Sequence, residues 1–327
     1  MRDLIVLGVE QGVTDRDMLA NLAIRRGIFV REEGTRPYDY SSIYRYLDSI
    51  RFLRFEQAET ISDPIVWSTA AKELVDAAKN SSPDHLSPQE KAIFRTRILE
   101  SEANEQFLSC FCMVGKRLRS ESDFARRCKP LYILRLLKKP KDDKRSLKSQ
   151  PIQTVEFTQD RDSAIRCRKP AMEFLYTYRL WCLDSGLIEE LNVKEAERSG
   201  VPKNLKHVLY PIRYQPPPST VEFLQLLYAF ANEPAKPVVI PIPKLLYGIC
   251  LDLRIPVHVF LDLLVQTWKS HRDLLHLERG PGILVSRAVA SQKRAQSDRF
   301  GNHRFYIIID GTLRSNLILY PRKKQNE

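Results

Sequence analysis

The alternation of apolar and polar positions in the first part of the chain predicts three helices followed by a short hairpin. Asp39, Ser41 and Ser42 are candidate N-caps of the third helix, whose apolar residues recur at helical spacing and form one stripe. After Leu53 the period changes to two, and a Ser-Asp-Pro turn at 62–64 separates two β-prone runs. The predicted elements are helices over 4–9, 17–26 and 40–53 and strands over 55–59 and 65–67.

This order of elements resembles the winged-helix (winged helix-turn-helix) superfamily over the first 80 residues. The resemblance implies a third helix that many such domains place in the major groove of DNA, whereas others only hold proteins together. The polar face of this helix carries Tyr44, Arg45, Asp48 and Arg51. Arginine and tyrosine can contact base edges or phosphates, so Tyr44, Arg45 and Arg51 are candidate DNA-binding residues. The alternative is a solvated face with a packed tyrosine.

The middle of the chain predicts helices first and paired strands afterwards. A linker over 80–87 precedes a helix that begins at Ser87, with Pro88 at its first position and Glu90 completing a capping box. The further elements expected here are a helix over 104–113, a helix that starts at Ser120 or Ser122, a strand edge at 155–157, a helix over 171–183 opened by Pro170, and strands over 187–191 and 205–214.

A proline-rich stretch over 215–219 is the strongest predicted linker, and the elements beyond it repeat the same order. The helix over 257–269 takes the place of the third helix, and a long polar and basic loop takes the place of a wing. The predicted elements are helices over 221–231, 244–253 and 257–269 and strands over 275–277, 283–286, 305–310 and 313–320.

The sequence therefore predicts a mainly helical α+β chain with small β-hairpins. Two or three winged-helix-like domains in series are expected: 1–80, 88–214 with a basic loop over 126–148, and 219–327 with a basic wing over 287–304. A chain of 327 residues exceeds what one core usually serves, which agrees with several domains. The order of elements is similar to the recognition part of some type IIS restriction enzymes and to certain replication initiators.

The net charge of +12 is concentrated in two stretches. Residues 112–150 hold 13 basic and 4 acidic side chains, and residues 287–327 hold 9 basic and 3 acidic ones. Residues 1–111, in contrast, carry 14 basic and 18 acidic side chains. Such concentration is typical of a phosphate-binding surface, although a charge run is ordinarily just solvated. The candidate DNA-binding residues in the two basic stretches are Lys138, Lys139, Lys141, Lys144, Arg145, Lys293, Arg294, Arg299 and Arg304.

Catalytic motifs are absent from the sequence. Cys110 and Cys112 have no second pair or histidine at zinc-site spacing, so all six cysteines are expected to be reduced and free of metal. His271, Asp273 and Glu278 form the one weak candidate for a catalytic or metal-binding set. No phosphate-binding glycine loop, metalloprotease motif or nuclease-like carboxylate cluster is present, so no cofactor is expected.

These observations predict a non-catalytic protein that binds double-stranded DNA, with sequence or site specificity, through tandem winged helices and two basic loops. It would act as the recognition subunit of a larger DNA-processing or defence system, with catalysis supplied by a protein partner. A protein–protein adaptor with winged helices as docking modules, or an RNA-binding protein, is the alternative. Apolar runs such as 260–265 are far shorter than a membrane span, and a cytoplasmic, nucleoid-associated location is expected.

Overall fold

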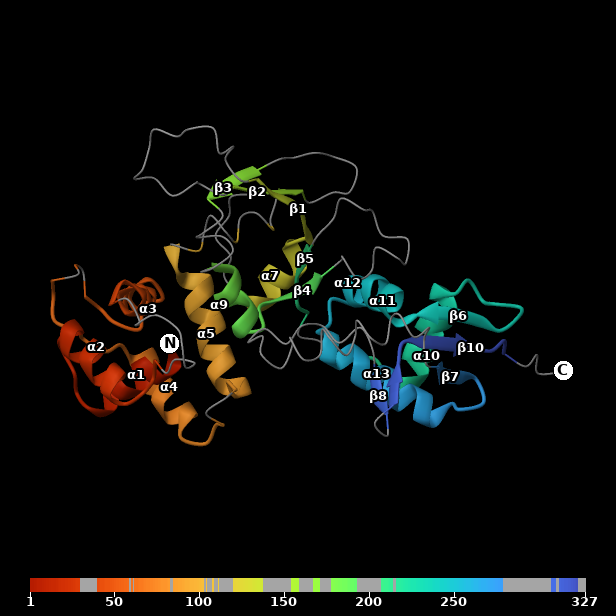
Figure 1. The fold of residues 1–327 in the computed structure, drawn as a ribbon, viewed down its shortest axis with the longest axis horizontal. Helices are drawn as coiled ribbons and strands as arrows, with labels where there is room; N and C mark the ends of the chain where they lie inside the picture. Colours follow the sequence, from red (N-terminus) through yellow and green to blue (C-terminus); the bar gives the residue numbers. More distant parts are fainter. Residues whose placement is uncertain are drawn as a thin grey trace. The chain divides into compact units, whose positions relative to one another are not determined.

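The structure of the chain is a computed structural model in which helices alternate with small antiparallel sheets (Figure 1). It describes residues 1–29, 40–58, 60, 62–82, 85–102, 104, 108, 111, 120–137, 154–158, 167–170, 178–192, 207–213, 216–278, 307–309 and 312–322. This mixture of helices and small sheets agrees with the predicted α+β class. No helix in those ranges is long and apolar enough to cross a membrane.

The chain divides into two compact units. Unit 1 comprises Met1–Asp123 and Tyr178–Leu187, and unit 2 comprises Phe124–Thr177 and Ile188–Glu327. The limits of these units differ from the three predicted segments, 1–80, 88–214 and 219–327. The division into three domains therefore stays a prediction.

Unit 1 is built from helices, and both neighbours in sequence and helices far apart in sequence pack together. Helix α1 packs against α2 and α4, α2 against α3, and α5 against both α4 and α9 (Figure 1). The predicted apolar stripe of α3 is buried at Ile43, Leu47 and Ile50, which confirms the helical period. The helices are α1 (Arg2–Glu10), α2 (Arg16–Arg25), α3 (Tyr40–Phe52), α4 (Thr69–Ala78), α5 (Pro88–Glu100) and α9 (Arg179–Asp184).

Side-chain caps set the starts of α2, α4 and α5, and the sequence predicts the cap of α5. The Asp15 carboxylate accepts a hydrogen bond from the backbone N–H of Met18 at the start of α2. Ser87 and Glu90 form a capping box at the start of α5, with Pro88 at the first helical position. Local sequence alone is sufficient to place the start of α5.

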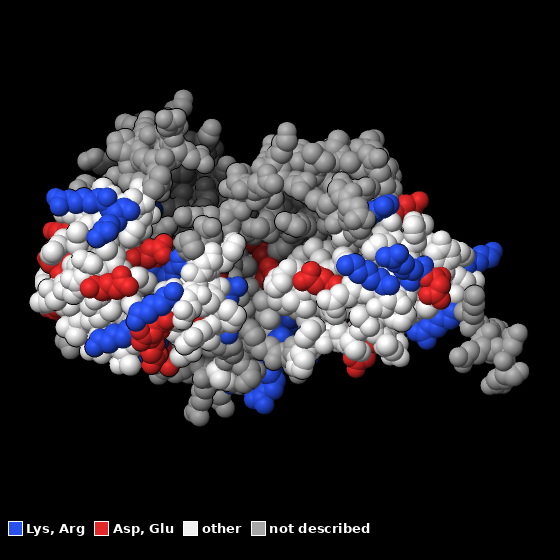
Figure 2. All heavy atoms as spheres, turned by 90° about the horizontal axis from the view of Figure 1, so that it is seen from below, with Lys and Arg blue, Asp and Glu red and all other residues white. Residues whose placement is uncertain are grey.

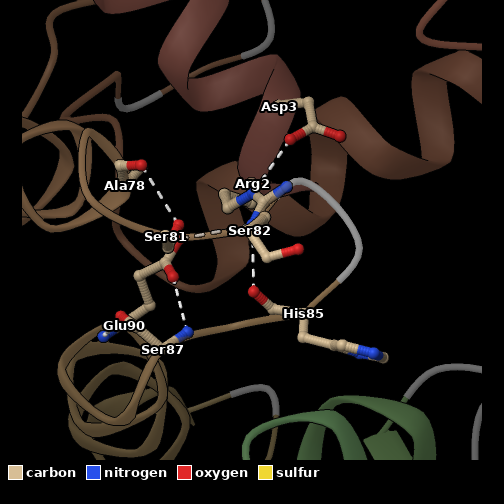
Figure 3. Close-up of polar contacts among 8 residues, drawn as sticks. All are labelled: Arg2, Asp3, Ala78, Ser81, Ser82, His85, Ser87 and Glu90. Atoms are coloured by element: carbon tan, nitrogen blue, oxygen red, sulfur yellow. Dashed lines mark hydrogen bonds and ion pairs between the residues drawn. The ribbon is translucent and has the colours of Figure 1, made fainter.

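The segment before α5 is bound to α1 through Arg2 (Figure 3). The Arg2 guanidinium donates to the backbone carbonyls of Ser82 at 2.9 Å and His85 at 3.4 Å. It also lies 3.6 Å from the carboxylate of Glu90, whose side chain is fully buried. The predicted linker over 80–87 is therefore attached to the N-terminal helix, and α4 and α5 belong to one compact unit.

The hairpin predicted after α3 is reduced to one antiparallel bridge, Glu56 to Trp67, within the described residues. The neighbouring backbone hydrogen bonds join Gln57 to Val66 and Ser68 to Phe55. A third bond runs from Ile65 N–H to the carbonyl of Thr14, between α1 and α2. The prediction of two full strands was wrong for the described residues, since one bridge is all that pairs the two runs there.

Unit 2 begins with a five-stranded antiparallel sheet in the order β3-β2-β1-β5-β4. Helix α7 (Glu121–Arg127) leads into it. The predicted pairing of the strands near 187–191 and 205–214 is confirmed, since β4 and β5 pair along their whole length. The strands are β1 (Leu131–Leu137), β2 (Thr154–Thr158), β3 (Cys167–Pro170), β4 (Ile188–Asn192) and β5 (His207–Pro211).

Pro170 ends β3, where an edge strand tolerates a residue without a backbone N–H. The first residues of the helix predicted over 171–183 lie outside the described residues. The described part of the helix that follows starts only at Arg179. The prediction that the basic block 126–148 is one loop was wrong, because the apolar run Leu131–Leu137 forms β1 between two neighbouring strands. The many charged residues on either side of Leu131–Leu137 led to the prediction of a loop, although this run itself is apolar and β-prone.

The rest of unit 2 places helices α10 and α13 against a three-stranded antiparallel sheet with the order β6-β10-β7 (Figure 1). The helices are α10 (Thr220–Phe230), α11 (Ile242–Leu245), a π-helical turn (Leu246–Cys250), α12 (Leu251–Leu253) and α13 (Val257–Ser270). The strands are β6 (Val238–Pro241), β7 (Leu275–Glu278), β8 (Ile307–Ile309), β9 (Thr312–Arg314) and β10 (Asn316–Leu319), with β8 and β9 paired as a hairpin. The three predicted helices and the strands predicted at 275–277 and 305–310 are confirmed within a few residues, whereas the strand predicted over 313–320 is divided into β9 and β10. Strand β6 was not predicted, and the strand predicted over 283–286 lies outside the described residues.

One hydrophobic core serves both parts of unit 2. Leu191 and Val208 of the five-stranded sheet are buried together with α10, α13 and the three-stranded sheet. Tyr210 is fully buried, and its hydroxyl donates to the carbonyl of Ile255 at 2.9 Å. The proline-rich stretch over 215–219 therefore connects two halves of one packed body.

Candidate nucleic-acid interface

The polar face of α3 holds three of the predicted DNA-binding residues, and two of them have partners inside unit 1. The hydroxyl of Tyr44 donates to the carboxylate of Asp17 on α2. The guanidinium of Arg51 lies 3.9 Å from the carboxylate of Asp48 and 5.3 Å from the centre of the Phe52 ring. Tyr44 therefore joins α3 to α2, whereas the two contacts of Arg51 lie within α3.

Arg16 connects this face to the bridge that follows α3. Its buried guanidinium forms an ion pair with Glu56 and lies 3.8 Å from Asp48. Burial raises the pKa of Glu56, and the charges of Arg16 and Arg51 oppose that rise without cancelling it. The cluster of two arginines and two carboxylates fixes α2, α3 and the bridge to one another.

Arg45 differs from its neighbours on α3. Its side chain is exposed, and none of the described residues pairs with its guanidinium. It lies on the same helix as Tyr44 and Arg51 and can reach a phosphate or a base edge without breaking an internal contact. Of the three predicted residues on α3, Arg45 alone has this freedom in the described residues.

The other nine predicted residues lie outside the described residues, on two connections between strands. Lys138, Lys139, Lys141, Lys144 and Arg145 fall between β1 and β2, whose ends pair at Leu137 and Thr154. Lys293, Arg294, Arg299 and Arg304 fall between β7 and β8. On the face drawn in Figure 2, the described Lys and Arg side chains are interspersed with Asp and Glu. The charge excess of the sequence thus lies mainly on segments that the structure does not describe.

The sequence predicted α13 as a third helix but indicated no binding residues on it. The structure shows that this helix has a polar face. Its opposite face is buried at Phe260, Leu264 and Thr267. The exposed positions repeat every three or four residues, which is the signal that a search for polar spacing would have found. They are His258, Asp262, Gln266 and Lys269.

The set of His271, Asp273 and Glu278 does not form a metal site. No group of three or more metal-binding side chains occurs among the described residues. His271 ends α13, whereas Asp273 and Glu278 are exposed. The catalytic reading of these three residues therefore has no geometric support.

The cysteines differ from the prediction by one disulfide. Cys182 and Cys250 are buried and free, as predicted, and burial raises the pKa of both thiols. Cys128, in contrast, is disulfide-bonded. Its partner is not among the described side chains, since Cys182 and Cys250 are free. The prediction of six reduced thiols was wrong because sequence spacing did not reveal which cysteines the fold brings together.

Comparison of the whole chain with known proteins adds no relative. No family model, no curated protein and no solved structure matches this chain.

Proposed function

We propose that the protein binds double-stranded DNA, without cutting it, through winged-helix-like units and basic loops. The observation that carries the proposal is the arrangement around α13. Helices α10 to α13 are followed by strands β7 and β10 of one antiparallel sheet, and the basic segment with Lys293, Arg294 and Arg299 lies between these strands in sequence. That is the place of a wing beside a third helix.

The exposed face of α13 has the chemistry to read a major groove. Gln266 can make paired hydrogen bonds to adenine, Asp262 can accept from cytosine, and Lys269 can contact guanine or a phosphate. Arg45 on α3 would add a contact from unit 1, and the basic segment between β1 and β2 would add contacts from unit 2. Most of the affinity would come from phosphate contacts, and the sequence preference from α13.

Selection from a pool of random duplexes tests this proposal. The wild-type chain should enrich a preferred site, and the variant with Asp262→Ala and Gln266→Ala should lose that preference while still binding duplex DNA. Replacement of His276 and Glu278, which are exposed on β7, by Ala is the matched control and should leave the preferred site unchanged. Equal enrichment by all three proteins would exclude α13 as the reading helix.

A protein–protein adaptor is the second candidate, and unit 1 favours it. Tyr44 and Arg51 on α3 are engaged by Asp17 and Asp48. Large apolar side chains are exposed on the same unit at Met18, Phe52 and Val66. An adaptor that uses such surfaces would bind duplex DNA weakly or not at all, so the same selection separates the two functions.

A further inference from the structure

Two arginines of unit 2 lie side by side at the turn that precedes α13. The backbone N–H of Arg213, two residues after the end of β5, donates to the carbonyl of Arg254 at 2.9 Å. Arg254 is the residue that ends α12, and its half-buried guanidinium donates to the carbonyl of Ala125. Strand β5 thus brings a second cation to the turn between α12 and α13.

The backbone of Arg254 adopts a conformation that favours glycine. Its φ is 54° and its ψ 42°, in the left-handed region that residues with a Cβ rarely occupy. A helix end of this kind is most often glycine because glycine adopts it without steric cost. The presence of arginine in this conformation indicates a use for the side chain.

The two guanidinium groups have no carboxylate partner within the described residues. Burial lowers the pKa of Arg254, and the neighbouring charge of Arg213 lowers it further. Glu189 on β4 accepts a hydrogen bond from the backbone N–H of Val257 at 3.3 Å, at the start of α13. The backbone hydrogen bond makes the two arginines neighbours in the fold, and an anion held by both side chains would be stabilised by both charges.

We propose that Arg213 and Arg254 hold one backbone phosphate of duplex DNA at the turn before α13. The inference rests on the proposed function, which places α13 against a major groove. A phosphate held at this turn would fix the depth and angle of α13 but would carry no sequence information. Arg213, from the five-stranded sheet, would then make that sheet a part of the binding surface.

A salt series of duplex binding by the full chain tests the pair. The variants are Arg213→Gln, whose side chain is exposed, and Arg254→Gly, which removes the guanidinium and leaves the backbone in a conformation that glycine adopts freely. Lys236→Gln is the matched control. Lys236 is an exposed cation of the same unit and lies two residues before β6. Val238 of β6 pairs with β10, and β10 also pairs with Leu275, just after α13. It therefore lies at the far end of α13, which spans about 21 Å.

Each of the two arginine variants should flatten the slope of log affinity against log salt by up to about 0.9, the value for complete loss of one phosphate contact. Neither variant should change the preferred sequence, and Lys236→Gln should keep the wild-type slope. Wild-type slopes in both arginine variants, with duplex binding intact, would overturn this inference and leave the proposed function standing. Absence of salt-dependent duplex binding by the wild type would overturn both. A melting curve identifies a variant that fails to fold, and Arg213→Gln alone then decides.

Discussion

Arg16 and Glu56 form a buried ion pair that joins the start of α2 to the bridge after α3. The two partners are not equivalent, because burial raises the pKa of Glu56 despite the charge of Arg16. Loss of the cation should therefore harm the fold more than loss of the anion. Asp48 lies 3.8 Å from Arg16 and would still be its partner in a variant without the Glu56 carboxylate.

We expect Arg16→Met to lower the free energy of unfolding by about 3–5 kcal/mol, since it leaves the Glu56 charge buried without its partner. Glu56→Gln should cost about 1 kcal/mol, the size of an ordinary substitution. Urea unfolding at neutral pH measures both, and the double variant should be more stable than Arg16→Met alone. Equal costs for the two single variants would contradict the predicted asymmetry.

The raised pKa of Glu56 also predicts a pH dependence. In the folded chain this carboxyl keeps its proton over a pH interval in which the unfolded chain has lost it, so its contribution to stability falls as the pH rises. The interval begins near the ordinary glutamate pKa of about 4.3 and extends upward to the raised value. The stability difference between wild type and Glu56→Gln should therefore decrease across it. An increase of that difference with pH would mean that Arg16 lowers the pKa of Glu56.

Gly8 is required by the packing of α1 against Trp67. A Cβ at this position would overlap the Trp67 ring, which is held by a hydrogen bond of 2.9 Å from its Nε1 to the carbonyl of Val13. Gly8→Ala should cost about 1–3 kcal/mol of unfolding free energy, although alanine is the better helix former. Glu10→Ala, at an exposed position of the same helix, is the control and should change stability by about 0.5 kcal/mol or less.

The sequence predicted the ends of helices more accurately than it predicted which side chains are held by internal partners. The capping box at Ser87 and the extent of α13 depend on neighbouring residues, and the sequence was sufficient for them. The partner of Tyr44 is Asp17, 27 positions away, and the pairing of β1 with β5 joins residues more than 70 positions apart. Periodicity does not report such contacts. It therefore placed Tyr44 and Arg51 on the correct face of α3 without revealing that internal partners hold them.

Arg45 is exposed, whereas the guanidinium of Arg51 has contacts inside α3. If α3 contacts DNA, Arg45→Ala should cost about 1–3 kcal/mol of binding free energy at one position of the preferred site, with no change in melting temperature. Arg51→Ala should affect binding less, because Asp48 and the Phe52 ring hold its side chain. Fluorescence-anisotropy titrations against single-base variants of the site measure both. A larger binding loss for Arg51→Ala would show that DNA displaces its internal contacts.

Duplex binding itself is the central claim, and its dependence on the basic segments is the most direct test. The measurement is an anisotropy titration with duplex DNA across a salt series, with melting curves as the control. The wild type is compared with two variants. The first carries alanine in place of Lys138, Lys139, Lys141, Lys144 and Arg145. The second carries alanine in place of Lys293, Arg294 and Arg299.

We predict that wild-type affinity falls steeply with salt, because each neutralised phosphate releases condensed counter-ions. Each variant should keep its melting temperature, bind more weakly and show a log–log salt slope flattened by up to about one unit for each lost contact. Stably folded variants with wild-type affinity and slope would contradict the account and favour the adaptor function instead.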